Sequence, residues 1–200
     1  MLSFLHKTIR TFAIIAVIVV FGWLSVKAIT PSGRLAATYD MARETPFISK
    51  LYPKDRVSGI LRDADNTPYR TLLREPVYFD LNPIDHFEQV AVTVKYKNLS
   101  GVPVKFGGLG SKESWSFDFR ELPPTGAEPR IITEIFDFRK LAPEGRKFRF
   151  GFSTPGAENG DVEIFAIEAL FTRKPLTEKE VVNKILDAVV KRLNIIFGSE

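Results

Sequence analysis

The stretch FEQVAVTVKYKN, residues 87–98, indicates the fold class of this chain. Apolar and polar side chains alternate along it. A repeat of two residues is typical of a strand with one buried face, because successive side chains of a β-strand point to opposite faces. The apolar set on one face is Val90, Val92, Val94 and Tyr96, and we predict that these four side chains face a core.

Similar short segments of alternating apolar and polar residues occur on both sides of this stretch, and turns rich in Gly, Pro, Asn and Asp separate them. About eight or nine short strands separated in this way predict an antiparallel sandwich of two sheets. The other expected strands lie within 57–61, 69–73, 75–83, 102–109, 114–122, 130–138, 147–155 and 162–173. The expected fold is therefore mainly β, a jelly-roll-like antiparallel β-sandwich with an N-terminal transmembrane helix and a C-terminal amphipathic helix.

Most of the 17 phenylalanines are placed to fill the core of such a sandwich. In SWSFDFREL, residues 114–122, the side chains of Trp115, Phe117 and Phe119 share one face. In KFRFGFSTP, residues 147–155, three phenylalanines share one face in the same way. Stacked aromatic rings suit a core about 10 Å thick, so we expect these rings to pack inward.

Two acidic side chains fall on otherwise apolar faces of the expected strands. Glu134 shares a face with Phe136, and Glu168 shares one with Ile164 and Leu170. Each of the two is either a buried acid or a sign that the faces of its strand are assigned wrongly.

Residues 12–24, FAIIAVIVVFGWL, carry no charge and follow Lys7 and Arg10. The uncharged residues 11–26 would span about 24 Å as a helix, against a hydrocarbon core of about 30 Å, and flanking cations that reach the headgroups can cover the difference. We expect a single-pass anchor within 1–29, with its N-terminus in the cytoplasm. The alternative is a cleaved signal peptide. Both place residues 30–200 outside the cytoplasmic membrane.

Residues 30–55 are expected to form a tether between this anchor and the sandwich domain, which we place at 56–174. Pro31, Pro46 and Pro53 divide the tether into short pieces, and 34–43 would suit a short helix.

Residues 175–200 are predicted to form an amphipathic helix. Thr177 and Glu180 have the spacing of a capping box, in which each side chain accepts a hydrogen bond from the backbone N–H of the other residue. The apolar arc of this helix is wider than a surface helix needs, so a partner or a membrane surface is expected to cover it. The candidate partner face is Val182, Ile185, Val189, Leu193 and Ile196.

The net charge of +4 lies mainly beside the apolar segment. Residues 27–62 hold seven Lys and Arg against three Asp and Glu, whereas 63–200 hold 19 against 21. Such an excess suits lipid headgroups or an anionic polymer, and without a basic stripe interleaved with aromatics it does not indicate nucleic acid. The absence of cysteine excludes disulfides and thiolate sites.

Catalytic and metal-binding patterns are weak in this sequence. His86 is the one histidine beyond the N-terminal flank, and no serine nucleophile motif accompanies it. Asp118, Glu121, Glu134 and Asp137 lie on adjacent expected strands, where a glycosidase would need two carboxyls in a cleft. Residues 63–66 and 158–161 offer oxygen ligands, but Asx turns explain both. We expect no enzyme and no cofactor, with a structural calcium ion as the one alternative.

The stretch EPVYFDLNPIDHFEQVAVTVKYKN, residues 75–98, and WSFDF, 115–119, resemble the ectodomains of small membrane-anchored bacterial proteins. More broadly, residues 57–173 are similar to galactose-binding-like jelly rolls. The resemblance implies a sandwich that binds glycans or proteins. It implies no catalytic residue.

Three functions remain open at this point. The first is an envelope scaffold or protein-binding module, anchored in the lipid bilayer. The alternative is a carbohydrate-binding module at the cell surface, for which Tyr69, Tyr78 and Tyr96 are the candidate ligand-binding aromatics. The second alternative is an envelope enzyme such as a glycoside hydrolase.

Overall fold

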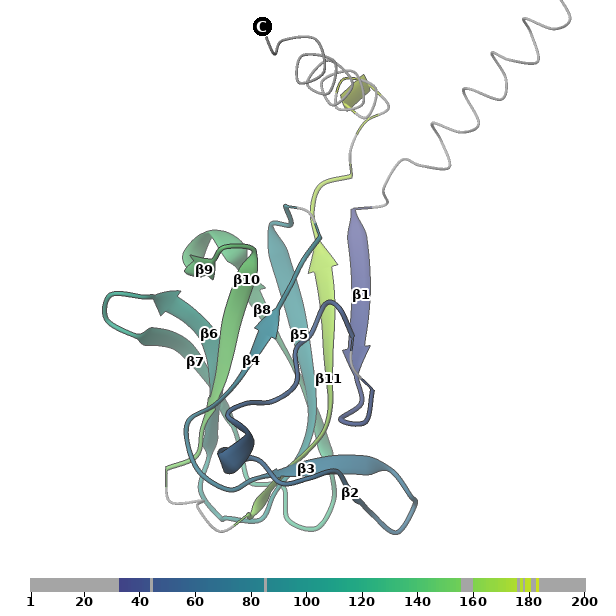
Figure 1. The fold of residues 1–200 in the computed structure, drawn as a ribbon, viewed down its shortest axis with the longest axis vertical. Coiled ribbons are helices and arrows are strands. Elements are labelled where there is room, and N and C mark those ends of the chain that lie inside the picture. The colour runs from purple at the N-terminus through teal and green to yellow at the C-terminus, as the bar shows by residue number, and fades with distance from the viewer. Residues whose placement is uncertain are drawn as a thin grey trace, which may run out of the picture. The chain divides into compact units, whose positions relative to one another are not determined.

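The computed structural model describes residues 33–43, 45–84, 86–155 and 160–175, together with 177, 179, 180 and 183. Within this part, Gly33–Lys174 form one compact unit made of two antiparallel sheets around a shared core (Figure 1). The prediction of a mainly β antiparallel sandwich is therefore confirmed.

The first sheet has the strand order β2-β3-β11-β5-β8, and β1 also pairs with β11. Its strands are β1 (Arg34–Tyr39), β2 (Leu61–Arg62), β3 (Pro68–Leu72), β5 (Gln89–Asn98), β8 (Arg130–Asp137) and β11 (Val162–Thr172). The second sheet has the order β4-β10-β6-β7, and β9 also pairs with β10. Its strands are β4 (Val77–Leu81), β6 (Val104–Ser111), β7 (Ser116–Leu122), β9 (Pro143–Glu144) and β10 (Lys147–Ser153). Two short 3-10 helices, η1 (Lys54–Arg56) and η2 (Phe138–Lys140), lie in the connections.

Phenylalanine rings from both sheets meet in the core. The ring of Phe106 lies 5.2 Å from that of Phe152, and Phe136 of the first sheet meets Phe150 edge-on at 5.0 Å. Val90, Val92, Val94 and Tyr96 of β5 are all buried, as their alternation predicts. The core therefore forms where the apolar faces of β5 and β10 oppose each other.

A β-bulge in β11 corrects the predicted faces of that strand. The pairing with β5 shifts between Ile164 and Ala166, so Ile164 and Ile167 both point inward. The residues after the bulge lie on the opposite face from the one that counting in twos from Ile164 assigns to them. Glu168 is therefore exposed on the outer surface. The prediction that Glu168 shares a face with Leu170 is therefore correct, whereas its assignment to the face of Ile164 was wrong, because one extra residue reverses a repeat of two.

Glu134 lies half-buried at the open edge of the sandwich. Its carboxylate is 3.7 Å from the Nε atom of Arg120 on β7, and the Arg120 guanidinium lies over the ring of Phe136 at 5.7 Å. Glu134 therefore shares the inward face with Phe136, as predicted, and an arginine from the facing sheet compensates its charge.

The expected tether differs from what the structure shows. Residues 34–39 form β1 in the first sheet, with Ala37 and Tyr39 buried. Farther along, Ile48 and Tyr52 form β-bridges to β4. The stretch RLAATY alternates in polarity much as β5 does. It forms a strand because its backbone pairs with β11.

The terminal predictions fall mostly outside the described residues. In the part of the chain that the structure describes, no helix is long and apolar enough to span a bilayer, and residues 12–24 lie outside that part. The capping box is present: the Thr177 N–H donates to Glu180 Oε2 at 2.7 Å, and the Glu180 N–H donates to Thr177 Oγ1 at 3.4 Å. The candidate partner face at 182–196 also lies outside the described residues.

Candidate ligand-binding face

One row of residues crosses the outer face of the second sheet. Tyr52 bridges to Tyr78 of β4, which pairs with Gly151 of β10. Gly151 pairs with Gly107 of β6, and Gly107 pairs with Phe119 of β7. Because directly paired residues point to the same side of a sheet, the row has aromatic side chains at both ends and two glycines between them.

The two glycines make room for this arrangement. A Cβ atom on Gly151 would lie 3.1 Å from the Tyr78 ring and 3.2 Å from the Phe117 ring, so these two rings meet over a residue without a side chain. A Cβ atom on Gly107 would collide with the backbone of β7, at 2.8 Å from Phe119 Cα. Glycine at these positions therefore lets the rings lie low on the sheet and lets β7 approach closely.

Four rings follow one another across the sheet. The ring centroids are 5.8 Å apart between Tyr52 and Tyr78, 6.0 Å between Tyr78 and Phe117, and 5.2 Å between Phe117 and Phe119. Trp115 adds a fifth ring at the end of the β6–β7 turn. We call the set Tyr52, Tyr78, Trp115, Phe117 and Phe119 the aromatic face.

The aromatic face is open to solvent at its β7 end. Trp115 is 56% exposed and Phe119 is 36% exposed. Trp115 also has a φ of +50°, a conformation that residues other than glycine adopt rarely and that is enriched at binding sites. Exposed aromatic side chains beside half-buried ones provide a surface on which an apolar ligand face can stack.

Arg149 of β10 lies at the centre of this face. Its guanidinium carbon is 5.7 Å from the Trp115 ring, 5.8 Å from the Tyr52 ring and 5.9 Å from the Tyr78 ring. A guanidinium at this distance from a ring is attracted by the negative charge of the ring face. Arg149 therefore holds rings from three separate segments against one another.

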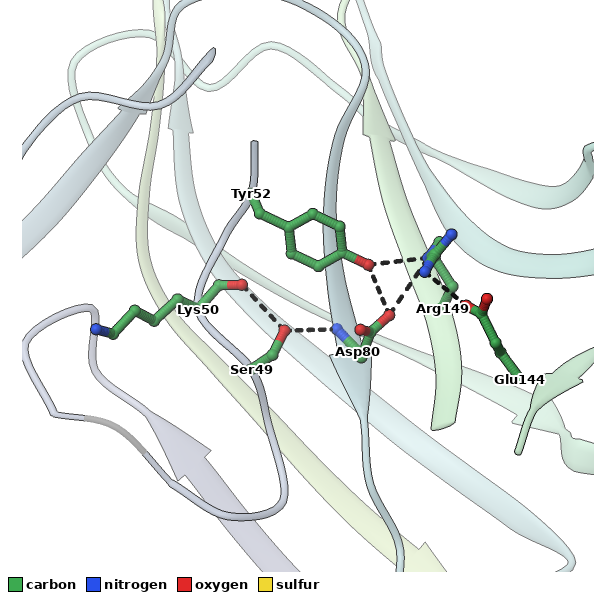
Figure 2. A network of polar contacts seen from close by, with 6 residues as sticks. All are labelled: Ser49, Lys50, Tyr52, Asp80, Glu144 and Arg149. Carbon is green, nitrogen blue, oxygen red and sulfur yellow. Dashed lines mark hydrogen bonds and ion pairs between the residues drawn. The ribbon is translucent and has the colours of Figure 1, made fainter. Parts of the chain in front are cut away.

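A polar network fixes Arg149 in place (Figure 2). Arg149 Nε donates to the Tyr52 hydroxyl at 2.9 Å, and Nη2 donates to Glu144 Oε2 at 2.6 Å. The Tyr52 hydroxyl donates to Asp80 Oδ1 at 2.7 Å, and the Asp80 N–H donates to Ser49 Oγ at 2.8 Å. The network thus joins the 49–52 segment to β4, β9 and β10.

The environment keeps the Tyr52 phenol neutral. Burial raises the pKa of Tyr52, and the Asp80 carboxylate that accepts a hydrogen bond from its hydroxyl raises it further, while Arg149 partly opposes the rise. Burial alone would lower the pKa of Arg149, but Tyr52, Asp80 and Glu144 more than offset this and raise it. The neutral Tyr52 hydroxyl therefore bridges the Asp80 carboxylate and the Arg149 guanidinium, which also lie 3.4 Å apart.

The raised pKa of Tyr52 predicts a specific pH dependence of stability. A folded-state pKa above the ordinary 10.0 stabilises the fold fully below pH 10, and this contribution disappears as the pH rises above that value. We expect Tyr52→Phe to lower the free energy of unfolding by roughly 1–3 kcal/mol below pH 10, because it removes a hydrogen bond to Asp80. Urea denaturation between pH 8 and 12 should show this difference narrowing above pH 10. A difference that widens there would contradict the assignment.

The three candidate aromatics from the sequence do not lie together. Tyr78 belongs to the aromatic face. Tyr69 lies on the other sheet, where its ring is 5.3 Å from Phe165. Tyr96 is fully buried, and its hydroxyl donates to the Pro123 carbonyl at 3.0 Å.

The prediction that Trp115, Phe117 and Phe119 pack inward is wrong, because all three belong to the aromatic face on the outer side of the sheet. Arg120 takes the inward side of β7 instead, because its guanidinium covers Phe136 and pairs with Glu134 at the sandwich edge. The rings of β7 then have to lie outside. Glycine on the outward positions of two neighbouring strands is the sequence signal that points to an aromatic face.

The predicted carboxylate cluster is divided among arginine partners. Asp118 pairs with Arg120, and Asp137 pairs with Arg139 at 2.7 Å. Hydrogen bonds from Arg139 lower the pKa of Asp137 to about 2. A carboxyl that has to donate a proton as a general acid needs a raised pKa, so this environment does not suit Asp137 to that role.

The turn at 63–66 is an Asx turn, as the sequence predicts. Asp63 Oδ1 accepts the backbone N–H of Asp65 at 3.0 Å and that of Thr67 at 2.8 Å. Among the described residues, no group of three or more His, Cys, Asp or Glu side chains is placed to hold a metal ion. His86 borders a separate hollow of about 290 Å³ beside Phe148.

Several solved structures are similar to the chain at low sequence identity. The xylan-binding module CBM15 is 14% identical with a TM-score of 0.47, covering 72% of this chain and 100% of that one. The CBM22-1 xylan-binding domain of Paenibacillus barcinonensis Xyn10C is 9% identical with a TM-score of 0.47, covering 69% and 94%. A cellulose-binding domain of Cellulomonas fimi β-1,4-glucanase C is 17% identical with a TM-score of 0.43, covering 68% and 92%.

The chain also matches parts of larger solved chains, such as an Arthrobacter globiformis isomalto-dextranase, of which it covers 23%. No protein-family model and no curated protein matches the sequence.

Proposed function

We propose that this chain is a glycan-binding module whose ligand lies across the aromatic face of the second sheet. The observation that carries the proposal is the unbroken sequence of rings from Tyr52 to Phe119, with Trp115 and Phe119 exposed at one end. A flat, partly exposed row of rings on an otherwise polar sheet is costly to leave in water, so it indicates a surface that a ligand covers.

The chemistry of the face suits sugar rings. A pyranose presents an apolar face of C–H groups, which stacks on an aromatic ring and removes apolar area from water. Its hydroxyls need hydrogen-bonding partners at the edge of the stack. Arg149, Glu144 and Asp80 supply donors and acceptors beside the rings, and their own bonds hold them in fixed positions.

A second candidate function is protein binding in the envelope. The observation in its favour is an apolar row on the outer face of the first sheet, where Leu170 pairs with Ala91 and Ala91 pairs with Ile135. Ile135 is 63% exposed and Leu170 is 40% exposed. This row has no rings, so it favours a protein partner over a sugar.

Membrane anchoring completes the proposal. Residues 12–24 would hold the module at the outer side of the cytoplasmic membrane, with Lys7 and Arg10 on the cytoplasmic side. Alkaline carbonate extraction of membranes tests this: the full-length chain should stay in the membrane pellet, and its release into the supernatant would contradict the anchor.

Tryptophan fluorescence of the full-length chain tests glycan binding. The chain has two tryptophans, so Trp23→Phe leaves Trp115 as the only indole. Titration with soluble oligosaccharides of xylan, cellulose, β-1,3-glucan and polygalacturonate should quench and shift this emission with at least one of them, because a stacked sugar removes water from the ring. The matching insoluble polysaccharide should retain the protein. If no glycan changes the emission and none retains the chain, the proposal is wrong.

A further inference from the structure

A hollow of about 610 Å³ adjoins the aromatic face at its Tyr52 end. Tyr52 and Asp80 line this hollow and also belong to the polar network around Arg149. The other lining residues come from 49–59 and from Arg70 on β3. A ligand lying along the rings from Phe119 to Tyr52 would therefore reach the hollow without leaving the surface.

The charges that line this hollow are mainly positive. Lys50, Lys54 and Arg70 contribute three positive charges, and Asp80 contributes the one negative charge. Asp80 already accepts the Tyr52 hydroxyl and lies 3.4 Å from Arg149 Nε, so its charge is compensated within the network. The hollow therefore presents a positive potential to a ligand.

The fold holds the arginine of this group in position. Arg70 Nη1 donates to the Ser58 carbonyl at 3.1 Å, and Nε lies 3.4 Å from the Met41 carbonyl. Lys50 and Lys54 line the same hollow and are exposed to solvent. One cation held by backbone carbonyls and two exposed ones suit the recognition of an anion.

We infer that the glycan bound by this module is anionic, and that a carboxylate, sulfate or phosphate substituent occupies the hollow lined by Lys50, Lys54 and Arg70 while neighbouring sugar rings stack on the aromatic face. This inference rests on the proposed function and names the ligand class of the same site. A neutral glycan makes the stacking contacts alone, whereas an acidic one adds charge-assisted hydrogen bonds at one end.

The test compares charged and neutral oligosaccharides on the full-length chain. The probes are oligogalacturonate, a sulfated galactan oligomer, a phosphorylated mannan oligomer and neutral xylo-oligosaccharide, each titrated at low and high salt. At least one anionic probe should bind about tenfold more tightly than the neutral one at low salt, and this advantage should shrink at high salt. The probe that binds most tightly identifies the substituent.

Two double variants test whether the lysines that line the hollow cause the preference for anionic probes. Lys50→Gln with Lys54→Gln should remove most of the advantage of the anionic probe and leave the affinity for the neutral probe unchanged. Lys95→Gln with Lys140→Gln, which removes two charges elsewhere, should change neither affinity, and circular dichroism should show both variants folded. Equal affinity for charged and neutral probes, or an equal loss in both paired variants, would overturn the inference while the proposed function stands. The proposed function itself fails if none of the probes binds.

Discussion

Replacing both Trp115 and Phe119 by alanine is expected to weaken glycan binding by roughly a hundredfold. A stacked ring contributes about 1.4 kcal/mol, which corresponds to about tenfold in affinity, and the double variant removes two such rings. Both side chains lie on the outer surface, so their removal leaves the core intact. Isothermal titration of the full-length chain with the tightest-binding oligosaccharide measures the change.

A matched control comes from the outer face of the first sheet. Ile131 and Ile135 are each 63% exposed, and their replacement by alanine removes exposed apolar area of a similar kind. Glycan affinity should stay within twofold of the original in this control. If the isoleucine variant loses binding and the Trp115 and Phe119 variant does not, the ligand face has been assigned to the wrong sheet.

Phe106→Ala is expected to lower the free energy of unfolding by about 3–5 kcal/mol. Phe106 is 1% exposed, and its ring contacts those of Phe79, Phe136 and Phe152 at 6.2, 5.8 and 5.2 Å. Its removal leaves a cavity that three rigid rings cannot fill. Because a domain is typically stable by about 5–15 kcal/mol, this loss is a large part of the total. Guanidinium denaturation followed by circular dichroism measures it.

Phe119→Ala is the internal comparison for this result. It deletes the same side chain from the same sheet, but from its outer face, so we expect a loss below about 1 kcal/mol. A similar loss for both variants would mean that the ring of Phe119 is part of the core, which would remove the physical basis of the aromatic face.

The sandwich was predictable because its central strands are regular. The alternation in 87–98 places Val92 and Val94 inside, and the structure buries both. The same reasoning locates Phe150 and Phe152 in the core. A repeat of two residues shows which side chains share a face when no residue is inserted in the strand. In 87–98 one of the two faces is clearly apolar, so the repeat also shows which face is buried.

The aromatic face was not predictable from periodicity alone. Alternation shows that Trp115, Phe117 and Phe119 share a side, but it does not show which side faces the core. That choice depends on Arg120 and Glu134, which lie far apart in the sequence and meet only across the two sheets. The role of Tyr52 was missed for a related reason, since a single bridge to Tyr78 brings it onto the face.

Hydrogen exchange measured by mass spectrometry, on the full-length chain with and without its tightest-binding oligosaccharide, tests the assigned face most directly. The account predicts slower exchange in three separate segments, 49–53, 116–122 and 147–153, whose outward side chains come together on the outer face of the second sheet. Protection confined to 130–135 and 166–170, on the first sheet, would contradict it.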